Sequence, residues 1–154
     1  MDPERYLDPM GEAISEASKA LVHGDVPVGA VALLDDKIIA RRHNEREMRQ
    51  NPISHAEILL LEELSGSFAS WRLEEITVVV TLEPCFMCCG ALMAARVKRL
   101  VFGAFDQSGG ACGSLYNLCC DPRLNHEIEL IPGVRELECS AILTDFFQKR
   151  RLGC

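Results

Sequence analysis

The stretch ITVVVTLEPCFMCCGALMAARVKRLVFGA, residues 76–104, shows the plan of the fold more clearly than any other part of this 154-residue chain. It opens with a continuous apolar run, rich in β-branched residues, from Ile76 to Leu82, which is typical of a strand buried on both faces. Pro84 ends that strand, and the segment 86–96, rich in Ala, Met and Leu, predicts a helix. Another short apolar run at 100–102 predicts a second buried strand. This part of the chain therefore predicts a strand, a helix and a strand in succession.

The spacing of apolar residues predicts the same alternation on either side of this unit. The elements expected over the whole chain are helices over 4–23, 55–64, 86–96 and 135–151 and strands over 28–34, 38–41, 76–82, 100–102 and 127–131. Ser54 is the expected N-cap of the second helix, because Glu57 three residues later completes a capping box. The polar stretch 42–52 is expected to be a loop. We expect one domain, 1–154, with an α/β fold: a three-layer α/β/α sandwich built on a mixed five-stranded sheet.

Composition and charge limit the class of protein. Apolar residues make up 48% and charged residues 25% of the chain, so a folded core is expected rather than disorder. No stretch approaches the roughly 20 apolar residues that a membrane helix needs, and the acidic, proline-broken start MDPERYLDPM lacks the pattern of a secretory signal. Eight cysteines without such a signal indicate a reducing compartment, so we expect a cytoplasmic protein. The net charge of −7 argues against indiscriminate binding to nucleic acids.

Two short motifs contain residue types that bind metal ions. The motif HAE, 55–57, lies at one predicted helix start, and PCFMC, 84–88, opens the next predicted helix. Thiolates are favoured at a helix N-terminus, where free N–H groups and the positive end of the dipole stabilise negative sulfur. A redox disulfide is the alternative use of C-x-x-C, but that chemistry needs nothing from a distant His-x-Glu. One His and two Cys instead match three ligands of a tetrahedral zinc site.

An open zinc site is favoured over a closed one. A structural site needs a fourth protein ligand, whereas a catalytic site keeps that position for water. Cys89 is the nearby candidate, but adjacent residues on a helix point about 100° apart, so Cys88 and Cys89 do not both reach one metal ion. We therefore expect one Zn²⁺ ion on His55, Cys85 and Cys88. Taken alone, Glu57 would be a capping residue; beside zinc-bound water of lowered pKa, it has the chemistry to shuttle protons.

The order H-x-E and then P-C-x-x-C is the signature of zinc deaminases, in which the Glu is an acid and base and not a ligand. More narrowly, the chain resembles the TadA-type tRNA-specific adenosine deaminases of the cytidine/deoxycytidylate deaminase superfamily over nearly its whole length. The matching stretches are VPVGAV at 26–31, HAEI at 55–58, TLEPCFMCCGALMAARVKRLVFGA at 81–104, GGACGSLYNL at 109–118, LNHEIE at 124–129 and LTDFFQKRR at 143–151.

This resemblance implies a cytidine-deaminase-like fold, a homodimer and a zinc-dependent hydrolase that acts on C–N bonds of cyclic amidines. The implied reaction converts adenosine to inosine at the wobble position of a tRNA anticodon stem-loop, usually that of an arginine tRNA. Matched residue by residue, zinc falls on His55, Cys85 and Cys88, and proton transfer falls on Glu57. The residues that the match places at the substrate are Asn44, Ala56, Asp106, Asn125, Phe147 and Arg150.

Two other functions stay open when the residues are taken alone. A guanine, cytosine or nucleotide deaminase would share the zinc site and Glu57, and a negative net charge suits a small neutral substrate. A catalytically inactive, zinc-stabilised partner subunit is an alternative of another class, although such a site has no use for the Glu57 carboxyl group. The segment DFFQKRR, 145–151, and the pair Asn125 and His126 favour a tRNA substrate over both.

Overall fold

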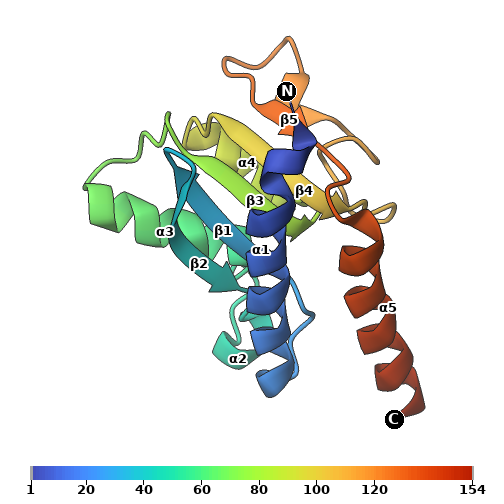
Figure 1. The fold of residues 1–154 in the computed structure, drawn as a ribbon. Coiled ribbons are helices and arrows are strands. Elements are labelled where there is room, and N and C mark those ends of the chain that lie inside the picture. Colours follow the sequence, from blue (N-terminus) through green and yellow to red (C-terminus); the bar gives the residue numbers. More distant parts are fainter. Residues whose placement is uncertain (1, 154) are drawn as a thin grey trace.

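A mixed five-stranded sheet forms the centre of the computed structural model, which describes residues 2–153 (Figure 1). The strands are β1 Gly29–Leu34, β2 Lys37–His43, β3 Thr77–Leu82, β4 Arg99–Ala104 and β5 Glu129–Ile131. They lie in the order β2-β1-β3-β4-β5. Strand β1 runs antiparallel to both of its neighbours, whereas β3, β4 and β5 run parallel to one another. The predicted α/β class and the mixed five-stranded sheet are confirmed.

Helices cover both faces of this sheet (Figure 1). The α-helices are α1 Leu7–Lys19, α2 Arg46–Arg49, α3 Ala56–Phe68, α4 Phe86–Ala94 and α5 Glu136–Leu152, and the 3₁₀ turns are η1 Pro3–Tyr6, η2 Ala20–His23 and η3 Leu118–Cys120. Helices α3 and α4 contribute Leu60, Leu64 and Leu92 to the core on one face. Helices α1 and α5 contribute Met10 and Cys139 to the core on the other. The helix expected over 4–23 is thus α-helical in its middle and 3₁₀ at both ends.

Each central strand supplies side chains to both cores, because successive residues of a strand point to opposite faces. In β1, Ala30 and Ala32 belong to the core under α3 and α4, whereas Val31 and Leu33 belong to the core under α1 and α5. Strands β3 and β4 divide their side chains in the same way. Burial on both faces is the physical reason for the continuous apolar runs that predicted these strands.

The start of α3 differs from the prediction. His55 occupies the N-cap position with extended backbone angles, and its side chain forms no capping hydrogen bond. The prediction of Ser54 as N-cap was wrong, because a capping box needs a glutamate that reaches back to the cap, and Glu57 is buried at the wall of a cavity instead. Helix α3 also extends beyond its predicted end to Phe68. It passes through the segment 65–67, whose sequence Ser-Gly-Ser has a low helix propensity.

The short helix α2 lies within the stretch that was predicted to be a loop. Asp25 accepts hydrogen bonds from the N–H groups of Glu47 and Met48, at 2.6 and 3.1 Å. These N–H groups belong to the first turn, where a helix offers its own donors no acceptor. A cap that comes from so far away along the chain leaves no local sequence pattern, so the loop prediction was wrong at this point.

Helix α1 lies so close to β1 that only glycine fits beneath it. A Cβ atom at Gly29 would lie 2.1 Å from the carbonyl oxygen of Ala13 and 2.5 Å from the backbone nitrogen of Ala17. Because both are backbone atoms of a packed helix, neither can move aside as the end of a flexible side chain could.

Gly29→Ala should therefore lower the free energy of unfolding by about 1–3 kcal/mol, the usual effect of overpacking. Gly66→Ala in α3 is the matched control: apart from its chain neighbours and the adjoining helix backbone, no atom lies within 4 Å of its Cβ position, so stability should stay the same or rise by up to about 1 kcal/mol. Urea unfolding followed by circular dichroism measures both changes. Equal stability of the two variants would contradict the close contact between α1 and β1.

Candidate active site

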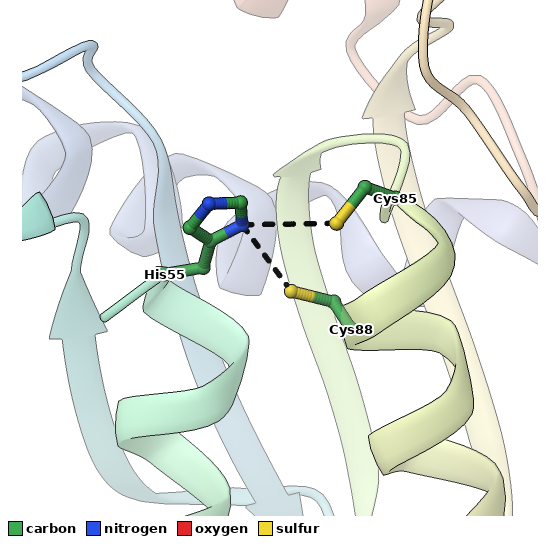
Figure 2. Close-up of side chains that lie close together, drawn as sticks. All are labelled: His55, Cys85 and Cys88. Carbon is green, nitrogen blue, oxygen red and sulfur yellow. Dashed lines mark hydrogen bonds between the residues drawn. The ribbon is translucent and has the colours of Figure 1, made fainter. Parts of the chain in front are cut away.

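Two helix N-termini meet at the carboxyl ends of the parallel strands. His55 is the N-cap residue of α3, Cys85 is the N-cap residue of α4, and Cys88 lies in the first turn of α4. Figure 2 shows the histidine ring on one helix directed toward the two sulfur atoms on the other. The chain enters α4 directly from the end of β3, through Glu83 and Pro84, so the sheet determines where both cysteines lie.

The three side chains hold their donor atoms at the spacing expected of ligands to one metal ion. The Nδ1 atom of His55 lies 3.8 Å from Sγ of Cys85 and 3.5 Å from Sγ of Cys88. A nitrogen and a sulfur bound to tetrahedral zinc, at about 2.0–2.1 and 2.3 Å, lie about 3.6 Å from each other. All three donor atoms lie within 4.8 Å of one another, and Cys89 belongs to a separate group, as its direction on the helix predicted. The residues present fit a zinc ion with an open position.

The ionisation of the Cys85 thiol also favours the binding of a metal ion. Its hydrogen bond with Cys88 lowers the pKa of Cys85 to about 4, and the neighbouring His55 lowers it in the same direction. The hydrogen bond with Cys85 also raises the pKa of His55, and the bond with Cys85, burial and the nearby Glu57 raise the pKa of the Cys88 thiol. The N-termini of α3 and α4 add the positive ends of two helix dipoles. Cys85 is therefore a thiolate, the form in which cysteine binds metal ions.

Glu57 lies in the first turn of α3 and lines a cavity of about 150 Å³ beside the three donors. It is only 4% exposed, and burial raises the pKa of its carboxyl group. The residues that line the cavity are Val26, Val28, Asn44, Arg46, His55, Ala56, Glu57, Leu82, Glu83, Cys85 and Asp106. A carboxyl group at the wall of a buried pocket can accept a proton and return it to another atom nearby.

Half of the expected substrate residues line this cavity. The ones that do are Asn44, Ala56 and Asp106. Asn125 lies exposed in the loop before β5, and Phe147 and Arg150 lie exposed on the C-terminal half of α5. In Figure 1, that half of α5 extends past the sheet toward the same end of the molecule as α2. Contact between these three residues and a substrate stays a prediction.

Asn44 is held in a fixed orientation at the cavity wall. Its Nδ2 atom donates to the carbonyl oxygen of Val26 at 3.2 Å, and its Oδ1 atom accepts from the backbone N–H of Arg46 at 3.1 Å. Sequence reasoning missed Arg46 as a lining residue, and its position close after Asn44 in a polar stretch was the available signal. It also missed Glu83 and the apolar walls formed by Val26, Val28 and Leu82.

Glu83 ties the segment 106–114, here called the glycine-rich loop, to the end of β3. It is 2% exposed, and its carboxyl oxygens accept hydrogen bonds from the backbone N–H groups of Asp106, Cys112 and Ser114 at 3.0, 3.0 and 2.9 Å. The Ser114 hydroxyl donates a further bond at 2.5 Å. A Cβ atom at Gly110 would lie 2.3 Å from this carboxyl group, so glycine is what allows the loop to come so close. Glu83 therefore fixes the wall of the cavity at Asp106.

Known proteins with a similar sequence or structure are deaminases. The family model of the MafB19-like deaminases matches residues 5–151. The tRNA-specific adenosine deaminase of Bacillus subtilis (strain 168) is 50% identical over 142 residues, which cover 92% of this chain and 88% of the relative. A solved structure from work on A-to-I editing by tRNA deaminases at the wobble position has a TM-score of 0.83 and 36% identity, and the match covers 87% of this chain and 97% of that one. A guanine deaminase from Nitrosomonas europaea, with a TM-score of 0.73 and 21% identity over 89% and 81% of the two chains, shares the fold.

Glu83→Gln should lower the free energy of unfolding by about 1–3 kcal/mol, because an amide group in place of a carboxylate leaves buried N–H donors of the loop without an acceptor. The matched control is Glu75→Gln. The Glu75 side chain is 75% exposed and lies 3.7 Å from Lys98, so its change should stay within about 0.5 kcal/mol. Chemical denaturation measures both. A Glu83 variant as stable as the control would contradict the role of this residue in holding the loop.

Proposed function

Because this chain belongs to the family of tRNA-specific adenosine deaminases, we propose that it converts adenosine to inosine at the wobble position of a transfer RNA, in the cavity beside His55, Cys85 and Cys88. Water replaces the exocyclic amino group of the base, and ammonia leaves. The observation that carries the proposal is Glu57, a buried carboxyl group that faces the cavity from the same end of α3 as His55. A group of donors that bound metal only for stability would need neither the cavity nor this acid.

We propose that one Zn²⁺ ion per subunit binds to His55, Cys85 and Cys88, whose distances fit a tetrahedral ion. Imidazole and thiolate donors are the types that zinc takes, whereas magnesium and calcium take oxygen. When bound, zinc acts as a Lewis acid that makes a water molecule acidic enough to react at neutral pH.

The side chains of the cavity supply proton transfer and orientation. Glu57 accepts the two protons of the attacking water in turn, and it passes one to N1 of the adenine ring and the other to the amino group, which leaves as ammonia. Ala56 is the first residue of α3, so its N–H has no acceptor within the helix and is available to the base. The Asn44 amide keeps one further donor and one further acceptor position beyond the bonds that hold it. These groups orient the base, while the apolar walls keep bulk water away from it.

We propose that the substrate is the anticodon stem-loop of an arginine tRNA, as the family resemblance implies. A single-stranded loop base enters a cavity without the cost of opening a duplex. Asp106 lies at the cavity, and Asn125, Phe147 and Arg150 are the proposed contacts to neighbouring nucleotides. The last turn of α5 is basic, which suits phosphate binding. The net charge of the chain is −7, so its overall charge does not attract RNA, whereas the basic end of α5 attracts phosphate groups locally.

We also propose that the enzyme is a cytoplasmic homodimer. Within residues 2–153, no helix is both long enough and apolar enough to cross a membrane. The cysteines of this part of the chain are free thiols, which suits a reducing compartment.

Sedimentation equilibrium at micromolar concentration should give twice the mass of one chain, and a monomer mass under those conditions would contradict the homodimer.

The proposed reaction is tested with zinc-loaded protein, incubated with an arginine tRNA that carries adenosine at the wobble position. Parallel samples contain free adenosine, guanine or cytidine. We expect inosine in the tRNA alone, detected by nuclease digestion and mass spectrometry of the nucleosides. Product from a free base or nucleoside only would overturn the proposal in favour of a small-molecule deaminase. No product in any sample would indicate an inactive zinc-binding subunit.

Three variants separate proton transfer from metal binding in the same assay. Glu57→Gln should lower kcat by about 10²–10⁴-fold and keep its zinc, because the amide has the shape of the acid but cannot accept the proton. Cys88→Ser should lose zinc and activity together. Cys120→Ser, at an exposed cysteine outside the site, should keep both. Zinc is measured by mass spectrometry of the purified proteins, and a Glu57 variant with wild-type kcat would rule out the proton shuttle.

A further inference from the structure

A second group of sulfur atoms lies inside the protein, apart from the site of the proposed reaction. Cys89 comes from α4, Cys112 from the glycine-rich loop and Cys119 from η3. The Sγ atom of Cys119 lies 3.7 Å from that of Cys89 and 3.6 Å from that of Cys112, and all three lie within 4.8 Å of one another. The three residues are at most 1% exposed. We call them the buried cysteine cluster.

The buried cysteine cluster is separate from His55, Cys85 and Cys88, although α4 contributes to both. Cys88 and Cys89 follow one another on a helix, so their side chains point about 100° apart. Each joins its own group of three donors, and the two groups share no residue. An ion in one group therefore leaves the ligands of the other unused.

The spacing of the cluster fits three thiolates around one ion. Two sulfurs bound at about 2.3 Å lie about 3.8 Å apart when the ion is tetrahedral and about 4.0 Å apart when it is trigonal. The observed 3.6 and 3.7 Å lie within a few tenths of an ångström of these values.

The number and type of donor atoms in the buried cysteine cluster indicate which kind of metal ion it binds. A structural zinc ion is bound by four protein ligands. Within residues 2–153, the cluster comprises three donors and no fourth His, Cys, Asp or Glu. Soft thiolate ligands select soft ions, of which Cu(I) is one that accepts three sulfurs. We propose that Cys89, Cys112 and Cys119 form a second metal site, which binds a soft monovalent ion of the Cu(I) type in three-coordination.

An ion can reach this site by way of the segment 112–119, which carries two of its ligands. Most residues between Cys112 and Cys119 are exposed or half-buried, and Cys120 beside them is exposed. A local opening of this segment uncovers the sulfurs without disturbing the sheet. Once bound, the ion would connect α4, the glycine-rich loop and η3, and would stabilise the folded state by mass action.

The experiment uses reduced protein that already contains zinc, with Cu(I) supplied from a coloured chelator complex. Loss of the chelator colour gives the affinity, and mass spectrometry gives copper and zinc per chain. We expect one copper ion taken up while zinc is retained, a sulfur-only first shell of three atoms in X-ray absorption, and a higher midpoint of thermal unfolding. These readouts do not depend on deaminase activity, so they test the second site even if the proposed reaction fails.

Cys89→Ala, Cys112→Ala and Cys119→Ala each remove one ligand. Each should weaken copper binding by more than about 100-fold, since the loss of a residue that only supports a ligand already costs about 10–100-fold. Cys139→Ala, at a buried cysteine on the opposite face of the sheet, and Cys120→Ser are the matched controls and should bind copper as the wild type does. Copper that enters only as zinc leaves, or that binds equally to all variants, would overturn the proposal. So would a reduced wild-type protein that takes up no copper.

Discussion

The donor atoms of His55, Cys85 and Cys88 come from two different helices and lie within 4.8 Å of one another, an arrangement that depends on how those helices pack on the sheet. His55 and Cys85 both occupy N-cap positions, so α3 and α4 must begin at the same edge of the sheet. Helix α4 begins there because β3 ends there, and α3 lies beside it through the core that contains Leu60 and Leu92. That core is closed to solvent, because the strands beneath it are buried on both faces. The geometry of this donor group is thus a consequence of how two helices pack on one sheet, and the side chains need little freedom to reach each other.

The buried acidic side chains serve two purposes: some hold loops in place, and one is placed to exchange protons with a substrate. A carboxylate inside a protein is costly unless hydrogen bonds compensate for the water it loses. Asp25, fully buried, pairs with His23 at 2.7 Å and caps α2, and Glu83 accepts four hydrogen bonds from the glycine-rich loop. Both acids are occupied in holding loops beside the cavity. Glu57 lines the cavity as Glu83 does, and burial raises the pKa of the Glu57 carboxyl group. A carboxyl group in that position can exchange protons with a substrate, whereas the other two cannot do so without releasing a loop.

Sequence patterns predicted the parts of the molecule that local rules determine. Strand β3 and helix α4 follow from apolar runs and from Pro84, and the grouping of His55, Cys85 and Cys88 follows from the spacing H-x-E and C-x-x-C at helix starts. The patterns failed where a distant residue decides the outcome. Helix α2 depends on a cap from Asp25, which lies far before it in the chain. The cavity wall at Asp106 depends in the same way on a hydrogen bond to Glu83, which lies far before Asp106. Cys112 and Cys119 lie in irregular segments, so no regular ligand spacing revealed that they meet Cys89.

The two cysteine groups are physically connected, although they share no ligand. Helix α4 carries Cys88 toward the cavity and Cys89 toward the buried cysteine cluster. A second connection runs through Glu83, which accepts hydrogen bonds from the backbone of Cys112 in the cluster and of Asp106 at the cavity. An ion in the cluster would hold both connections in one arrangement, and a closely packed interior transmits such a constraint with little loss. If that arrangement is the one that binds substrate, linkage requires each ligand to strengthen the binding of the other by the same factor.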